Sequence, residues 1–241
     1  MRVYTIMNKN TNWIWSENNS RNQHVLFVKN VKSTKLSGKL NIKITAAYHY
    51  ELFINGKFVS RGPVHGNPEN CLFDELSYDL TKDKELNIAI VVNYYKDTHI
   101  HYLIPTETGG LTAEFSSENL SFSTDETWKY LDLNMWKVDA PEKSFMINYL
   151  EDYDARKEPT GWDDKYFTND IIKDWDNAVL IPDSDEIWQN YSHRPVPYLK
   201  RKIITPIGFT AFKTDEQGAE KIEDISTYCE KEKLDIISEK Y

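Results

Sequence analysis

Short stretches of alternating or continuous apolar residues follow one another through the first half of the chain. They have the length of strands and show no helical periodicity, which favours β structure. The most apolar stretch, LNIAIVVNYY, is short enough to be a central strand that is buried on both faces. The pattern predicts strands at His24 to Val31, Lys39 to Tyr48, Leu86 to Tyr95, Gly110 to Ser117 and Leu120 to Thr124.

The segment YELFINGKFVSRG contains two alternating stretches separated by Asn55-Gly56. Asn and Gly tolerate the positive φ angles of a two-residue hairpin turn. The segment therefore predicts a tight β hairpin with Asn55 and Gly56 at its tip.

Many short strands with turn residues between them indicate an antiparallel β-sandwich rather than a parallel α/β fold. We expect a mainly β chain of the jelly-roll or galactose-binding-like type, with short helices and an acidic C-terminal tail. The predicted organisation is a lead segment at 1–23, a sandwich at 24–212 and an acidic tail at 213–241, where a following element starts.

After Trp128 the chain becomes rich in loop-forming residues. Asp174 to Ala178 is expected to close a short helix, and the two prolines of Arg194 to Arg201 predict an extended segment. A last strand is expected at Ile203 to Phe212. In the tail, apolar residues with rough helical spacing predict an amphipathic helix that docks partly on the sandwich or frays.

Charge and cysteine content narrow the classes of partner. The 241 residues have a formal net charge of -9, which disfavours nucleic acid and anionic membranes. No apolar run approaches the length of a membrane span, and the N-terminus lacks the apolar region of a secretory signal. Cys71 and Cys229 lie far apart, and two free thiols in a cytoplasmic protein are the favoured interpretation.

No phosphate loop, nucleophile elbow, zinc cluster or dinucleotide motif is present, and no cofactor is predicted. His99 and His101 would share one face of a strand but lack a third metal ligand, so a surface or partly buried role is favoured. Four aspartates lack the regular spacing of a calcium loop and are interpreted as solvated; they are Asp152, Asp154, Asp163 and Asp164.

The segment YDARKEPTGWDD, from Tyr153 to Asp164, is too polar for a core strand and too broken for a long helix. Asp154, Arg156 and Glu158 alternate, so on an extended segment they share a face and can brace one another. If Arg156 is partly buried, replacing it with Ala should destabilise the chain. A glycosidase needs two carboxylates that face each other across a cleft, and sequence proximity does not supply that arrangement.

Aromatic residues make up 13% of the chain, including 7 Trp and 15 Tyr, which suits stacking on sugar rings. The same residues populate the cores of β-sandwiches. Composition leaves both interpretations open.

Four segments resemble, in order, the N-terminal non-catalytic β-sandwich region of bacterial α-L-rhamnosidases, glycoside hydrolase family 78 and its relatives. They are Ala46 to Pro63 with the Asn-Gly hairpin, Phe73 to Leu80, Thr124 to Lys129, and Glu151 to Trp162. The last resembles the family signature GE-x-YDAR with its trailing Gly-Trp, and it is the most specific of the four. Leu150 departs from the pattern, because the family usually has Gly there.

The resemblance implies an accessory domain that supports or flanks the sugar site of a separate α/α-barrel domain. Family members have their catalytic carboxylates on that barrel, so no catalytic residue is assigned and the chain is expected to be inactive alone. The expected partner is a rhamnose-containing glycan or the catalytic domain. The alternatives are a free-standing carbohydrate-binding module and a small self-contained glycosidase. Candidate carbohydrate-binding or domain-docking residues are Arg61, Tyr153, Asp154, Arg156, Glu158 and Trp162.

Overall fold

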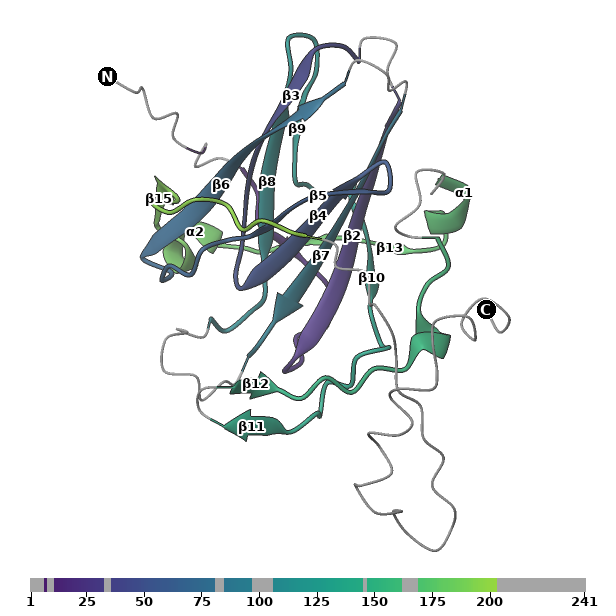
Figure 1. Ribbon diagram of the computed structural model, residues 1–241, viewed down its shortest axis with the longest axis vertical. Helices are drawn as coiled ribbons and strands as arrows, with labels where there is room; N and C mark the ends of the chain where they lie inside the picture. The colour runs from purple at the N-terminus through teal and green to yellow at the C-terminus, as the bar shows by residue number, and fades with distance from the viewer. Residues whose placement is uncertain are drawn as a thin grey trace, which may run out of the picture. The chain divides into compact units, whose positions relative to one another are not determined.

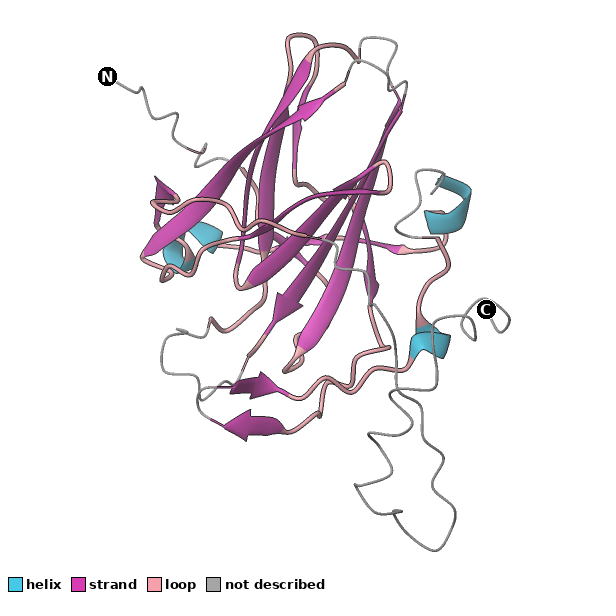
Figure 2. Ribbon diagram, viewed as in Figure 1, coloured by secondary structure: helices cyan, strands magenta, loops and turns pink. Residues whose placement is uncertain are grey.

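The computed structural model describes residue 7 and residues 11–32, 36–80, 85–96, 106–144, 147–161 and 169–202. Contacts divide the chain into two compact units, Met1–Leu199 and Lys200–Tyr241. Strands dominate the first unit, and its helices are short (Figure 2). The predicted strand at Ile203 to Phe212 and the predicted tail helix lie outside the described residues.

One sheet of the first unit has six strands, all of them antiparallel (Figure 1). Strand β7 lies between β2 and β4, and β5 forms one edge. In spatial order the strands are β13 (Asp176–Asn177), β10 (Lys129–Asp132), β2 (Gln23–Lys32), β7 (Glu85–Tyr94), β4 (His49–Ile54) and β5 (Lys57–Gly62).

The second sheet has seven strands, and its last pair, β6 and β15, is parallel. In order they are β14 (Val179–Leu180), β1 (Ile14–Trp15), β8 (Leu111–Ser116), β3 (Lys39–Ala46), β6 (Asn70–Asp79) and β15 (Asn190–His193), with β9 (Ser121–Ser123) paired to β8. Four further elements complete the description: the ribbon of β11 (Glu142–Ser144) and β12 (Ile147–Tyr149), the helices α1 (Asn169–Ile172) and α2 (Ser184–Ile187), and a 3-10 turn at Ala155–Lys157.

The two sheets confirm the predicted antiparallel sandwich, and the five predicted strands correspond to β2, β3, β7, β8 and β9. The hairpin is confirmed too, since β4 and β5 are joined by Asn55 and Gly56 with φ angles of 50° and 70°. One local prediction was wrong. Asp174 to Ala178 does not close a helix, because α1 ends at Ile172 and Asp176–Asn177 pairs with β10.

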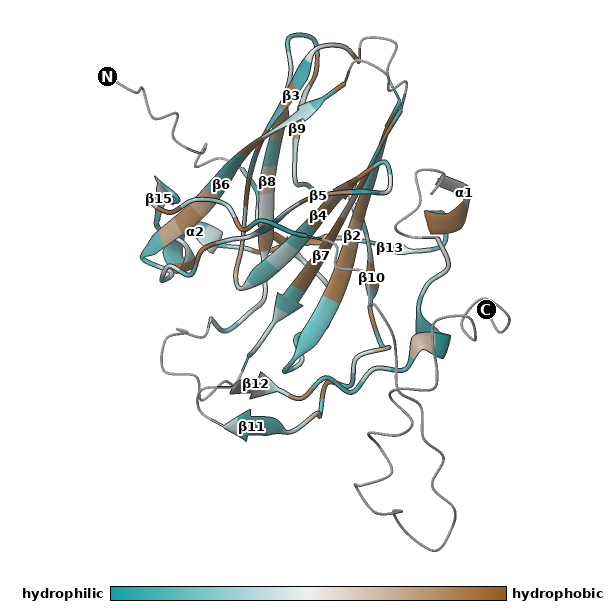
Figure 3. Cartoon of the chain, viewed as in Figure 1, coloured by the Kyte–Doolittle hydropathy of each residue, from teal (hydrophilic) through white to brown (hydrophobic). Residues whose placement is uncertain are grey.

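Alternating residues of both sheets form the core between them. Ile88, Ile90 and Val92 of β7 are fully buried there, opposite residues of β3 such as Ile42 and Ile44. The central strands are accordingly the most apolar in Figure 3.

The outer face of the six-stranded sheet is also partly covered. Leu26 and Ala89 on that face pack with Leu133 and Met135 from the segment after β10, and with Ile172 of α1. Strand β7 is therefore buried on both faces over its middle, as its apolar sequence predicted.

A buried ion pair fastens the end of the first unit to the sandwich. Arg194 Nη1 donates to Asp74 Oδ1 at 3.0 Å, and the two side chains are 3% and 0% exposed. Tyr50 of β4 donates its hydroxyl to Asp74 Oδ2. Asp74 lies on β6, so this carboxylate links a strand of each sheet to the chain that follows β15.

Arg194 also holds the extended segment that follows it. Its Nε donates to the carbonyl of Val196 at 3.0 Å, and Nη2 donates to the carbonyl of Pro197 at 3.2 Å. The guanidinium lies 4.4 Å from the centre of the Tyr198 ring, and the Tyr198 hydroxyl accepts from Glu75 N at 3.1 Å. These contacts fix the segment that was predicted only to be extended.

We expect Arg194→Met to lower the free energy of unfolding by about 3–5 kcal/mol, because it leaves a buried carboxylate without its partner. Urea denaturation measures the change. Combining it with Asp74→Leu should recover part of the loss, and the exposed Arg156→Ala is the matched control with little effect. A loss for Arg194→Met no larger than that of the control would contradict the argument.

Candidate functional site

Polar side chains form two cross-strand rows on the outer face of the six-stranded sheet. Asn93 of β7 lies between His24 of β2 and His49 of β4. In the next row, Glu51 of β4 pairs with Arg61 of β5. Residues directly opposite on neighbouring strands point to the same face, so these five side chains share one surface.

A cavity of about 340 Å³, here called the aromatic cavity, opens on this surface. Its floor comes from the strand residues His24, Glu51 and Asn93, and its walls come from the loops that cover the sheet. Three aromatic residues and a second carboxylate line those walls: Tyr95, Trp136, Tyr149 and Glu151.

Ring contacts fix the aromatic wall. Trp136 stacks on His24 with ring centres 4.3 Å apart, and its Nε1 donates to Glu151 Oε1 at 3.2 Å. Tyr95 and Tyr149 lie 5.4 Å apart, centre to centre. Because β12 ends at Tyr149, the small β11–β12 ribbon positions one side of the cavity.

His24 is uncharged at neutral pH. Asn93 Nδ2 donates to His24 Nε2 at 2.9 Å, a bond that needs the neutral imidazole. Burial lowers the pKa of His24 to about 4, against a smaller opposing effect of the Asn22 backbone. Desolvation likewise lowers the pKa of His49 to about 4, and the charges of His65 and Arg61 add to that shift. His24, His49 and Asn93 therefore offer neutral hydrogen-bonding groups beside the carboxylate of Glu51.

The YDAR segment, Tyr153 to Arg156, supports the aromatic cavity through contacts with Trp136 and its neighbour Met135. Tyr153 forms a β-bridge with Trp136, and their rings are 4.9 Å apart. Asp154 N donates to the carbonyl of Met135 at 2.8 Å. Desolvation and the hydrogen bond to Glu158 raise the pKa of Tyr153 to about 12. This segment holds Trp136 in place.

The expected bracing lattice within YDARKEP forms only in part. Arg156 donates from Nε and Nη2 to both oxygens of Asp154 at 2.8 Å, but the Arg156 side chain is 89% exposed. The partial burial assumed for Arg156 is wrong, because residues 155–157 form a 3-10 turn that projects this side chain into solvent. Glu158 instead bonds Tyr153. Exposed ion pairs contribute little to stability, so Arg156→Ala should have a small effect.

Arg61 lies apart from the YDAR segment, at a second cavity of about 480 Å³. This basic cavity, as it is called below, is lined by Arg61, His65, Pro197 and Leu199 together with His49 and Glu51. Trp162 lies outside the described residues. The structure thus groups Tyr153, Asp154, Arg156 and Glu158 in one loop and separates Arg61 from them.

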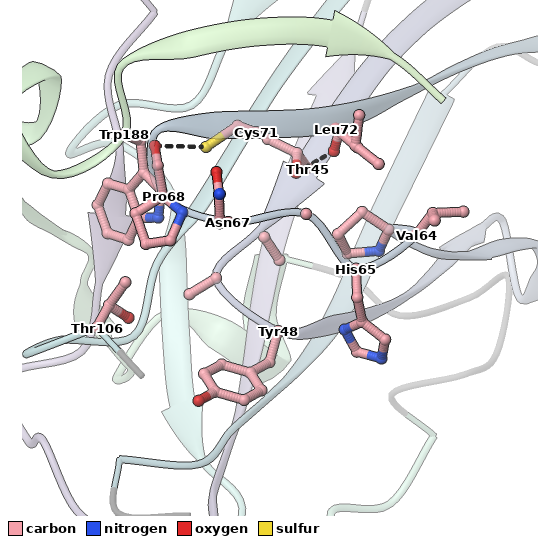
Figure 4. Close-up of a pocket in the computed structure, with 14 residues that line it drawn as sticks. Thr45, Tyr48, Val64, His65, Asn67, Pro68, Cys71, Leu72, Thr106 and Trp188 are labelled. Carbon is pink, nitrogen blue, oxygen red and sulfur yellow. Dashed lines mark hydrogen bonds between the residues drawn. The ribbon is translucent and has the colours of Figure 1, made fainter. Parts of the chain in front are cut away.

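A third cavity, between the loop after β5 and the turn between β3 and β4, holds only about 40 Å³ (Figure 4). Cys71, a free and buried thiol, donates to the carbonyl of Pro68 at 3.5 Å beside it. The volume suits water rather than a sugar ring.

Over the part of the chain that the structure describes, no three His, Cys, Asp or Glu side chains gather as a metal site. Asp152 is paired with Lys137, Nζ to Oδ2 at 2.6 Å. His99, His101, Asp163 and Asp164 lie outside the described residues. Within those residues no helix is long and apolar enough to cross a membrane.

No protein-family model and no curated protein matches the chain. Solved structures do. The family 78 rhamnosidase of Bacillus sp. GL1 is 27% identical, with a TM-score of 0.69 over 80% of this chain and 20% of that protein. The predicted resemblance to the family 78 α-L-rhamnosidases is confirmed in three dimensions.

Two further α-L-rhamnosidases share the fold with this rhamnosidase-like chain at 18% identity. The enzyme of Dictyoglumus thermophilum gives a TM-score of 0.54 over 73% of this chain, and that of Aspergillus terreus gives 0.55 over 76%. The chain spans only about a fifth of the three proteins, namely 20%, 21% and 22% of their lengths.

None of the candidate site residues predicted from the sequence lines the aromatic cavity. Its floor residues His24, Asn93 and Glu51 are polar positions within otherwise apolar strands, and they have the opposite alternation to the core residues. This alternation could be read from the sequence. The strand order that brings the three residues together could not.

We expect stability to fall as the pH drops from about 6.5 toward 4. The unfolded chain protonates His24 near 6.5, whereas the folded chain does so only near 4, so protons favour unfolding in that window. Between pH 7.5 and 5 this half-buried group accounts for a loss of roughly 1–2 kcal/mol.

Denaturant titrations at both pH values test this with His24→Gln, which should lose less stability than the native chain. The variant should still lose some stability at low pH, because the pKa values of His49 and His65 are also lowered. Equal losses in variant and native chain would show that His24 does not titrate in this way.

Proposed function

We propose that the chain is a non-catalytic accessory domain of an α-L-rhamnosidase-like glycoside hydrolase, which supports or flanks a sugar site completed by a separate catalytic domain. The similarity to the Bacillus sp. GL1 rhamnosidase is the observation on which this rests. It includes four fifths of this chain but only one fifth of the enzyme, as expected for a single module of a larger protein.

The surface of the first unit supports a docking role. Val196 is 47% exposed and Leu199 is 63% exposed, and both line the basic cavity. Arg194 holds this apolar segment in a fixed conformation, which reduces the entropy lost when a partner binds. A neighbouring domain that covers this segment would bury apolar surface on a rigid support.

A carbohydrate-binding module is the second candidate, and the aromatic cavity is the observation that favours it. Flat rings suit the C–H face of a pyranose, while Asn93, His24 and the carboxylates suit its hydroxyl groups. Both candidates are carbohydrate-related, and they differ in whether the chain acts together with a catalytic domain or by itself.

A self-contained glycosidase is the third possibility. Glu51 and Glu151 both line the aromatic cavity, but Glu151 accepts a hydrogen bond from Trp136 and so has a structural role. The similar enzymes are about five times longer than the region they share with this chain. We therefore assign no catalytic residue.

The purified chain should release no rhamnose from an aryl α-L-rhamnoside, measured by the absorbance of the freed phenol. Glu51→Gln is the matched variant and should give the same baseline. Release by the native chain that is lost in Glu51→Gln would establish the glycosidase and overturn the accessory-domain proposal.

A chimera tests the accessory role directly. This chain replaces the matching fifth of the Bacillus sp. GL1 rhamnosidase, and a version with that fifth deleted is the control. We expect the chimera to be at least tenfold more active on the aryl rhamnoside than the deletion and to melt at a higher temperature. A chimera no better than the deletion would contradict the proposal.

A further inference from the structure

We propose that the aromatic and basic cavities form one continuous groove, which binds a neutral oligosaccharide of at least two sugar units. This inference rests on the carbohydrate-related function proposed above and deepens it. Its starting observation is that His49, Tyr50 and Glu51 line both cavities. The first three residues of β4 thus line both cavities, which lie next to each other.

The size of the groove supports more than one sugar unit. The cavities measure about 340 and 480 Å³, and each alone falls in the range of pockets that hold small ligands, roughly 300–1,000 Å³. A single pyranose ring needs only one of the two cavities. A linked pair reaches both.

The two ends of the groove offer different chemistry. At the aromatic end, Tyr95, Trp136 and Tyr149 provide ring surface, and Asn93 provides an amide. At the basic end, the guanidinium of Arg61 stands beside the apolar surfaces of Pro197 and Leu199. Each end combines apolar area with hydrogen-bonding groups, the combination that sugar rings need.

The residues that line both cavities have groups available for a ligand. Glu51 is half-buried and lies opposite Arg61 on the neighbouring strand, yet neither takes part in an ion pair among the described residues. His49 contacts His65 edge to face, with ring centres 4.7 Å apart. Glu51 can therefore accept from hydroxyl groups of both sugar units, next to the linkage between them.

The charges in the groove select a neutral ligand. Glu51 and Glu151 would repel an acidic sugar at the aromatic end, and the net charge of -9 disfavours approach of a polyanion. Two arginines line the basic end. Arg194 is paired with Asp74, whereas the exposed guanidinium of Arg61 can donate several hydrogen bonds in a plane, which suits adjacent hydroxyl groups. Rhamnose-containing neutral oligosaccharides meet these conditions.

Isothermal calorimetry with two probes tests the groove: methyl α-L-rhamnopyranoside, and a neutral disaccharide with the same rhamnoside at its end. We expect the disaccharide to bind at least tenfold more tightly, because it contacts both cavities. Arg61→Ala should abolish that gain, because the contact with the second sugar unit at the basic end is lost. Trp136→Ala should weaken both probes, and the exposed Arg156→Ala should weaken neither.

Arg61 is exposed at a sheet edge, so its variant tests the inference without threatening the fold. Equal affinity for the two probes, or an Arg61→Ala variant that keeps the gain, would overturn the groove. So would the absence of binding by the folded chain. The chimera experiment is independent of this test. An active chimera combined with no sugar binding would retain the accessory function and reject the groove. Tight disaccharide binding combined with an inactive chimera would retain the groove and reject the accessory function.

Discussion

The ion pair between Asp74 and Arg194 is the interaction on which the arrangement of this unit depends. Both side chains are almost fully buried, and burial raises the pKa of Asp74, while the bonds from Tyr50 and Arg194 oppose that rise. The charge is compensated there because each carboxylate oxygen accepts a hydrogen bond, Oδ1 from Arg194 and Oδ2 from Tyr50. The backbone next to this carboxylate leaves no room for a side chain, since a Cβ atom added to Gly62 would clash with Asp74 Oδ2. Glycine at this corner lets β5 approach the carboxylate, and the guanidinium then orders the segment that lines the basic cavity.

On the outer face of the six-stranded sheet, strands and loops supply different kinds of side chain. The strands supply neutral imidazoles, an amide, a carboxylate and a guanidinium in register, and the loops supply aromatic rings. Rigid strands fix the spacing of the floor more closely than loops could. Tyr153 and Asp154, which looked like candidate ligand-binding residues, are supports for Trp136. The distinctive sequence of this segment is therefore explained by the loop it stabilises.

Local patterns predicted the strands and the Asn55-Gly56 hairpin, because alternation and turn chemistry are properties of neighbouring residues. They did not predict the Arg194 contacts, since nothing in RPVPYLKR indicates a carboxylate 120 residues away. The Arg156 argument failed for a related reason. Alternation on an extended segment says which side chains share a face, but the chain turns at 155–157, and none of the three residues of that turn is buried. The cavities lie beyond local patterns for the same reason as the ion pair, because their residues meet only through strand order.

The parallel pairing of β15 with β6 has a consequence for the solubility of shortened chains. Strand β6 is long, and β15 occupies the backbone hydrogen-bonding groups along its outer side from Asn70 to Phe73. An uncovered strand of that kind is a template for pairing with other molecules, whereas a four-residue edge such as β15 is a poor one. Cutting the chain before Asn190 would thus remove more than a peripheral strand. It would expose an aggregation-prone edge in every molecule and, in the same cut, take away the arginine that keeps Asp74 compensated.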